Sequence, residues 1–75
     1  MKNSFPNSAS VESLRLHYPA GTRVALVVMN DPYSTLVVGD EGSVVYVDDT
    51  GTIHVQWDNG SNLGAVYGVD LVRKL

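Results

Sequence analysis

Residues 43–57 read SVVYVDDTGTIHVQW, and this stretch decides the expected fold. Its first arm, residues 43–47, is rich in β-branched side chains, and its second arm, residues 52–57, alternates apolar and polar side chains. Alternation with a period of two is typical of a strand that turns one face to a core. Residues 48–51 join the arms and end in Gly51, which suits a type I turn followed by a left-handed residue. The stretch therefore predicts a β-hairpin.

Further strand patterns lie on both sides of this hairpin. Upstream, apolar side chains alternate over residues 24–28, and downstream, residues 71–75 are expected to close the sheet. Asn59-Gly60 predicts a tight turn, followed by a short strand near residues 61–63. Residues 29–42 contain several turn-forming residues and are expected to form one long loop. Five short strands with this loop and tight turns predict a mainly β protein, a small five-stranded SH3-like barrel.

The segment before the first strand changes to helical spacing. Val11, Leu14 and Tyr18 fall at i, i+3 and i+7, which is one face of a helix. Pro19 disfavours helical geometry in the residue before it, so a short N-terminal α-helix is expected over residues 8–18. Its apolar face is expected either to close one end of the barrel or to form a dimer interface, which leaves a monomer and a homodimer both open.

Length and composition limit the other possibilities. The 75 residues are enough for one domain, expected over residues 8–75 and preceded by a flexible N-terminus at residues 1–7. There is no cysteine, and two histidines cannot complete a structural zinc site, so neither a disulfide nor a metal is expected. No glycine-rich phosphate loop leads from a strand into a helix, and no cofactor is expected.

The charge balance bears on the class of partner. Eight acidic and five basic residues give a net charge of −3. Phosphate backbones select clustered Lys and Arg, so nucleic acid is a disfavoured ligand and a protein partner is expected instead. No apolar run has the length of a signal peptide or of a membrane span. A cytoplasmic protein without membrane contact is the expectation.

An ordered series of short motifs carries a family resemblance. The series consists of Tyr18-Pro19-x-Gly21-Thr22-Arg23-Val24, Met29-x-Asp31-Pro32-Tyr33, Gly39-x-x-Gly42-x-Val44, Val47-Asp48-Asp49-x-Gly51-x-Ile53-His54-Val55-x-Trp57-Asp58-Asn59-Gly60-Ser61, Leu63 and Gly68-Val69-Asp70. On this series the chain resembles the bacterial and phage family called domain of unknown function 4314. That family is associated with phages and integrative mobile elements and has no assigned activity, so the resemblance implies a context and no mechanism. Residues 42–44 and 55–60 also resemble SH3-like domains of the Mib/Herc2 kind, which are interaction modules.

One tripeptide in the chain has a catalytic association. Asp49-Thr50-Gly51 also occurs in aspartic proteases, but its place between two strand patterns favours an Asp-rich turn. A Ca²⁺ or Mg²⁺ site made by Asp48, Asp49 and Asp58 is a further alternative, but the spacing of a calcium loop is missing and solvated turn carboxylates are favoured. Neither histidine has triad partners at a fixed spacing. No catalytic residue is expected, and the chain is predicted not to be an enzyme.

Aromatic and acidic side chains are better candidates for contact with a partner. Tyr33 follows Asp31 and Pro32 in the long loop, where SH3-like barrels bind peptides, and both contact and core remain open for it. Trp57 shares a strand face with Ile53 and Val55, which favours the core over a contact. The candidate binding residues are Asp31, Tyr33, Tyr46, Asp48, Asp49, Trp57 and Asp58.

Two functional hypotheses follow. The first is a non-enzymatic protein-interaction module of phage or mobile-element origin that binds through residues 29–42 and the hairpin tips. The alternative is a small acidic inhibitor that blocks a nucleic-acid-binding surface of a host defence enzyme. The alternative is motivated by the acidic residues in or beside loops, which are Asp31, Asp40, Glu41, Asp48, Asp49 and Asp58. Direct nucleic-acid binding is less favoured, because five basic residues are few.

Overall fold

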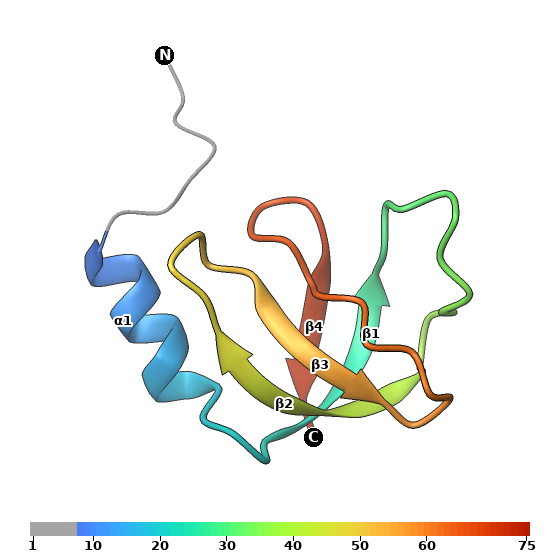
Figure 1. The fold of residues 1–75 in the computed structure, drawn as a ribbon, viewed down its shortest axis with the longest axis horizontal. Helices are drawn as coiled ribbons and strands as arrows, with labels where there is room; N and C mark the ends of the chain where they lie inside the picture. Colours follow the sequence, from blue (N-terminus) through green and yellow to red (C-terminus); the bar gives the residue numbers. More distant parts are fainter. Residues whose placement is uncertain (1–7) are drawn as a thin grey trace.

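One helix and four strands make up the regular structure of residues 8–75, the part of the chain that this computed structural model describes (Figure 1). In chain order they are α1 (Ser8–His17), β1 (Arg23–Val28), β2 (Glu41–Val47), β3 (Ile53–Trp57) and β4 (Leu71–Lys74). The strands form one antiparallel sheet in the order β3-β2-β1-β4. The expected mainly β fold with a short helix is therefore confirmed, whereas the expected flexibility of residues 1–7 lies outside the described residues.

The central hairpin forms where the alternating pattern predicted it. Strands β2 and β3 pair from Gly42 with Trp57 to Val47 with Ile53, with a bulge between Val44 and Tyr46. The turn closes through hydrogen bonds of 3.0 Å from the Asp48 amide to the Thr52 carbonyl and from the Gly51 amide to the Asp48 carbonyl. Gly51 has a φ of 83°, the left-handed conformation that a glycine adopts without strain.

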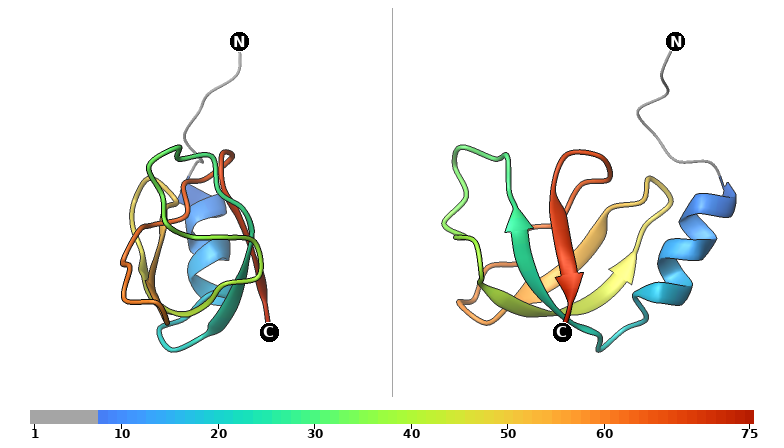
Figure 2. Two further views of the ribbon diagram at one scale, coloured as in Figure 1. Left: turned by 90° about the vertical axis from the view of Figure 1, so that its right-hand side faces the viewer. Right: turned by 180° about the vertical axis from the view of Figure 1, so that it is seen from behind.

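Strand β2 is the longest strand and is shared between two neighbours. Its first residues, 41–43, pair with β1, and residues 42–47 pair with β3. The sheet is strongly curved, and in both views of Figure 2 α1 lies across one end of it. Val11 on this helix is buried, and Leu14 and Tyr18 pack against the core. Of the two roles expected for the apolar helix face, the structure shows it packed against the core of its own chain, with the helix ending at His17.

The fifth strand expected near residues 61–63 is not found in the described part of the chain. There, side chains bind the backbone amides: the Ser61 amide donates to Asn59 Oδ1 (2.9 Å) and the Leu63 amide to Ser61 Oγ (3.3 Å). In this segment of the described chain, the pairing with β3 is reduced to a single bridge between Ala65 and Ile53. Because short polar side chains compete with strand pairing for these amides, the sheet is open rather than a five-stranded barrel.

The core lies on the concave side of the sheet and is apolar. Trp57 is 1% exposed, and its indole Nε1 donates to the Leu63 carbonyl over 2.8 Å, which satisfies its one polar atom. The other members of the central cluster are Val24, Leu26, Leu36, Val44, Val47, Ile53, Val55, Ala65 and Val72. No polar or charged residue is buried among residues 8–75. The helix in that range lacks the length and apolarity needed to cross a membrane.

Candidate functional site

The long loop between β1 and β2 is held in shape by its own side chains. Asp31 Oδ1 accepts the Tyr33 amide over 2.9 Å, and Asp40 Oδ2 accepts the Val37 amide over 3.0 Å. Leu36 is buried and fixes the middle of the loop to the core. Each bond satisfies a backbone donor that would otherwise need water, so the loop has a defined course despite lacking regular structure.

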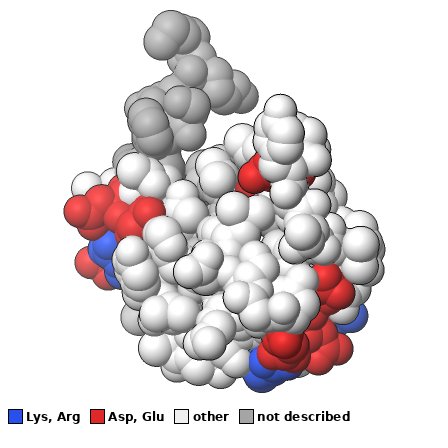
Figure 3. Space-filling view, turned by 45° about the vertical axis from the view of Figure 1, so that its right-hand side comes forward, with Lys and Arg blue, Asp and Glu red and all other residues white. Residues whose placement is uncertain are grey.

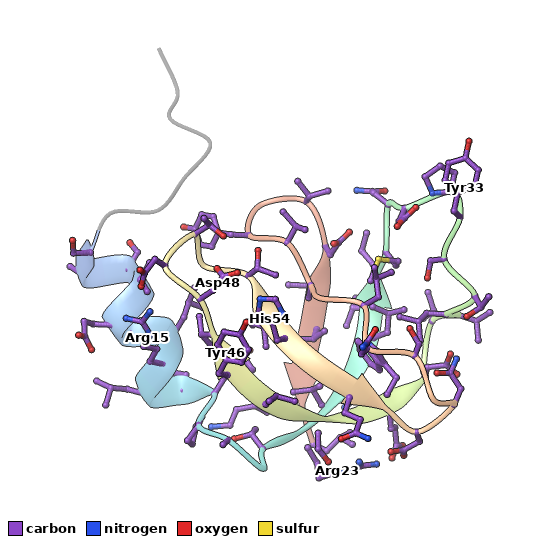
Figure 4. The ribbon with its side chains drawn as sticks, in the orientation of Figure 1. Arg15, Arg23, Tyr33, Tyr46, Asp48 and His54 are labelled. Carbon is purple, nitrogen blue, oxygen red and sulfur yellow. The ribbon has the colours of Figure 1, made fainter. Side chains whose placement is uncertain are left out.

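This fixed backbone presents apolar side chains to solvent. Tyr33 is 92% exposed, and Figure 4 shows it at the tip of the loop, pointing away from the sheet. Val37 and Val38 are 64% and 73% exposed. Of the two alternatives for Tyr33, the core is therefore excluded, and the side chain is available for contact. Exposed apolar groups on an ordered loop are typical of interaction surfaces.

The loop also docks on the turn that precedes β4. The Asn30 amide donates to Asp70 Oδ1 over 2.9 Å, and Asn30 Nδ2 donates to the Val69 carbonyl over 2.8 Å. The second Asp70 oxygen accepts the Val66 amide over 2.9 Å. One carboxylate therefore links two segments forty residues apart in sequence. Asn30 and Asp70 were not among the residues predicted from the sequence, because nothing in a single sequence pairs an Asn in one loop with an Asp in another.

Asp48 is the centre of a hydrogen-bond network at the β2–β3 turn. Its Oδ1 accepts the Thr50 hydroxyl (2.6 Å), the Thr50 amide (2.9 Å) and the Thr52 amide (3.0 Å), and its Oδ2 accepts a ring N–H from His54 Nε2 (2.8 Å). Burial raises the pKa of the Asp48 carboxyl, but these hydrogen bonds outweigh burial and lower the pKa well below its ordinary value of 3.8. Asp48 is therefore a fixed anion that organises the turn.

Tyr46 stacks on His54, the aromatic member of the Asp48 network. The rings of Tyr46 and His54 are parallel within 5°, with centroids 4.3 Å apart. Figure 4 shows the two side chains side by side on the outer face of the hairpin, with Asp48 next to them. The Thr50 hydroxyl donates to Asp48 rather than to the imidazole, so the order of groups differs from that of a hydrolytic triad. The arrangement fits a rigid, half-exposed aromatic surface.

The remaining predicted acidic residues lie at opposite ends of the hairpin. Asp49 accepts Arg15 Nη2 from α1 over 2.7 Å, and Arg15 Nε donates to the Val47 carbonyl over 3.1 Å. Asp58 is beyond β3, where it forms a two-point ion pair with Arg23. The hydrogen bonding between these two side chains lowers the pKa of Asp58 and raises the pKa of Arg23. The carboxylates of Asp48, Asp49 and Asp58 therefore do not converge, and no three potential metal-ligating side chains cluster anywhere in residues 8–75.

Figure 3 shows how these ion pairs shape one face of the molecule. Acidic and basic atoms touch one another in clusters at its left and lower right margins, a separate acidic group lies in its upper part, and the middle of the face is uncharged. Of the candidate binding residues, Tyr33 and Asp31 share the long loop, while Tyr46, Asp48 and Asp49 share the hairpin. Trp57 lies in the core, which is the position favoured by the strand face that it shares with Ile53 and Val55, and it offers no surface to a partner.

Comparison with known proteins gives one match. The model of a family described as "Domain of unknown function (DUF4314)" matches residues 7–75. No curated protein and no solved structure matches the chain.

Proposed function

Because the chain belongs to the family Domain of unknown function (DUF4314), with the mobile-element context that its motif series implies, we propose that it is a non-enzymatic protein-interaction module of phage or mobile-element origin. It acts in the cytoplasm of the host. It binds a protein partner through the loop of residues 29–42, with the hairpin tips as additional contacts.

The exposure of Tyr33, Val37 and Val38 carries this proposal. These side chains project from a backbone that Asp31, Asp40 and other loop residues hold in place. A loop that is ordered before binding loses less conformational entropy when the partner arrives, so more of the contact energy contributes to affinity. A large exposed aromatic side chain is also the residue type that most often dominates such an interface.

The proposal extends to the fold. The bridge between Ile53 and Ala65 occupies the place next to β3 at which a fourth barrel strand would pair, and the final strand returns to pair with β1. We propose on this basis that the open sheet follows the strand order of an SH3-like barrel, with one strand reduced to a single bridge.

The acidic inhibitor is less well supported by the charge distribution. A mimic of nucleic acid needs carboxylates that are free to meet a basic surface. Asp49 and Asp58 are paired with arginines of the same chain, and Asp48 is bonded to His54. Two arginines therefore offset part of the negative charge of the hairpin, and hydrogen bonds hold the Asp48 carboxylate within its own turn.

A pull-down from host lysate tests the interaction module. The tagged chain, the double variant Tyr33→Ser with Val38→Ser, and the control Leu16→Ser are compared, with nuclease added and bound proteins identified by mass spectrometry. Leu16 is 79% exposed on α1 and matches the loop residues in exposure. We expect a partner that binds the wild type and the control but is reduced roughly tenfold or more by the loop variant, as for other interface hot spots.

Three results would count against the proposal. Capture that disappears with nuclease makes nucleic acid the ligand or the bridge. Capture that the loop variant leaves unchanged places the interface elsewhere. Loss of capture at high salt together with loss in Asp48→Asn supports the acidic inhibitor instead.

A further inference from the structure

An apolar hollow lies away from the tip of the long loop, between α1 and the turn before β4. It has a volume of about 180 Å³. Its floor consists of core residues, and its walls come from the helix and the turn. The principal lining residues are Tyr18, Ile53, Ala65, Tyr67, Leu71 and Val72. We refer to it below as the helix–turn groove.

Hydrogen bonds fix both walls of the helix–turn groove. On one side, the Asp70 amide donates to the Val66 carbonyl over 2.9 Å, while Asp70 Oδ2 accepts the Val66 amide. On the other side, Arg15 ties α1 to the hairpin through the Val47 carbonyl and Asp49. The groove is therefore formed before any ligand arrives, which is usual for binding pockets. Tyr67 and Leu71 remain 41% and 54% exposed at its rim.

The size of the groove limits what it can hold. Pockets for drug-sized ligands and cofactors have volumes of about 300–1,000 Å³. The helix–turn groove is smaller than that range and has room for one large apolar side chain. A single side chain inserted into a pocket is the usual form of an interface anchor.

A positive charge without an ionic partner in the described part of the chain lies near Tyr18, one of the lining residues of the groove. Within residues 8–75, Arg15 and Arg23 are ion-paired, whereas Arg73 and Lys74 form no ion pair. Lys74 Nζ lies 6.0 Å from the centroid of the Tyr18 ring, and Tyr18 is a wall of the groove. Asp70 itself lines the groove, and its two carboxylate oxygens accept the backbone amides of Asn30 and Val66. The apolar cavity therefore has one charged lining residue, Asp70, whose oxygens are already bonded, and a nearby cation, Lys74, that has no anionic partner among the described residues.

We propose that the helix–turn groove binds a segment of a partner protein in which an aromatic or large aliphatic residue lies next to an Asp or Glu. The apolar side chain fills the cavity between Tyr18 and Leu71, and the carboxylate pairs with Lys74. This surface differs from the 29–42 loop, so the inference goes beyond the function proposed above. A basic neighbour would be repelled by Lys74, which gives the groove a preference by charge.

Binding of matched peptides to the whole chain tests this inference. The probes are short, end-blocked peptides that contain Phe-Glu, with counterparts in which Gln or Lys replaces Glu, or Ala replaces Phe. Amide chemical shifts of the isotope-labelled chain report the site. We expect the Phe-Glu peptide to shift the amides of Gly51, Ala65 and Gly68, and the Phe-Gln peptide to bind roughly two- to fivefold more weakly, as for an exposed ion pair.

Two variants separate the charge from the fold. Lys74→Gln should make the Phe-Glu and Phe-Gln peptides bind equally, whereas Arg73→Gln, which neutralises the other unpaired cation of β4, should keep the difference between them. Leu71→Ser, at an exposed rim position, should weaken both peptides together.

Several results would overturn the inference. They are the absence of groove shifts with every peptide, equal binding of the Phe-Glu and Phe-Gln peptides to the wild type, and a preference that survives Lys74→Gln. Amide shifts confined to residues 29–42 would also overturn the groove inference while supporting the loop as the interface. The failure of one proposal can therefore be told apart from the failure of the other.

Discussion

At the scale of single residues, Asp48 carries more hydrogen bonds than any other side chain at the hairpin turn. Asp48→Ala would leave the Thr50 and Thr52 amides without their acceptor and His54 without its partner. Because the site is only partly buried, we expect a loss of about 1–2 kcal/mol in the free energy of unfolding. Chemical denaturation at neutral pH measures it. The matched control is Asp49→Ala, whose exposed ion pair is worth at most about 1 kcal/mol, and equal losses in the two variants would contradict the assigned role.

The same carboxyl makes a prediction about pH. The folded-state pKa of Asp48 is lowered below its ordinary value of 3.8, so its ionised form stabilises the fold above the unfolded-state pKa. This contribution is lost as the pH falls through the folded-state pKa. In Asp48→Asn, which cannot ionise, the stability deficit relative to wild type should be constant from neutral pH down to about pH 5 and shrink below about pH 4. Denaturation curves across this range test it, and a deficit that grows with acid would refute the sign.

Gly42 shows the effect of a missing side chain. It pairs with Val24 of β1 and with Trp57 of β3, and a Cβ built there would lie 2.6 Å from Val55 Cγ1 and 2.8 Å from the Gln56 carbonyl oxygen. The backbone contact cannot be relieved by rotating a side chain. We expect Gly42→Ala to destabilise the protein by about 1–3 kcal/mol, as overpacking does elsewhere. Thermal unfolding measures this. Gly39→Ala is the comparison: it meets no atoms but has a φ of 96°, so its cost should come from backbone strain alone, about 1 kcal/mol.

At the scale of elements, Arg15 is the main polar link between α1 and the hairpin. Its Nε donates to the Val47 carbonyl and its Nη2 to Asp49. Arg15→Ala should increase local opening of α1 and of the β2–β3 turn by roughly threefold to tenfold, while β1 and β4 keep their protection. Hydrogen exchange followed by NMR measures the opening. Arg15→Lys retains the charge but not the two-point geometry, and it should restore only part of the protection. Uniform loss of protection across the sheet would show that the link acts on global stability instead.

Elements that repeat a local pattern were predictable from the sequence, and contacts between distant loops were not. The hairpin, the β1 alternation and the helix follow from periodicity over a few residues, so each was placed within a residue or two. The segment after Asn59 misled the prediction, because Asn59 and Ser61 bind backbone amides that a strand would use. The docking of Asn30 on Asp70 and the stacking of Tyr46 on His54 depend on how the sheet curves, which no local pattern encodes.

At the scale of the whole molecule, the distribution of charge shows which surfaces are available to a partner. Ion pairs within the chain use Arg15 and Arg23 against nearby carboxylates, while Arg73 and Lys74 stay unpaired among the described residues. Composition sets the net charge at −3, but only the fold shows that Asp49 and Asp58 are paired with arginines of the same chain. Two surfaces remain for a partner, the apolar loop tip and the helix–turn groove, and they differ in the charge that surrounds them.

The use of the helix face bears on the oligomeric state. A dimer through α1 would need an apolar stripe that the domain leaves uncovered, yet Val11 is buried and Leu14 and Tyr18 pack against the core of the same chain. We therefore expect a monomer of 8.1 kDa whose sedimentation and melting temperature do not change with protein concentration, since a dimer would melt higher at higher concentration. Analytical ultracentrifugation over a wide concentration range measures the mass. Leu16→Ser, at the exposed apolar position of the helix, should sediment as the wild type does. A wild-type mass that rises toward twice the chain mass, and falls back in Leu16→Ser, would show that the outer face of α1 is a dimer interface after all.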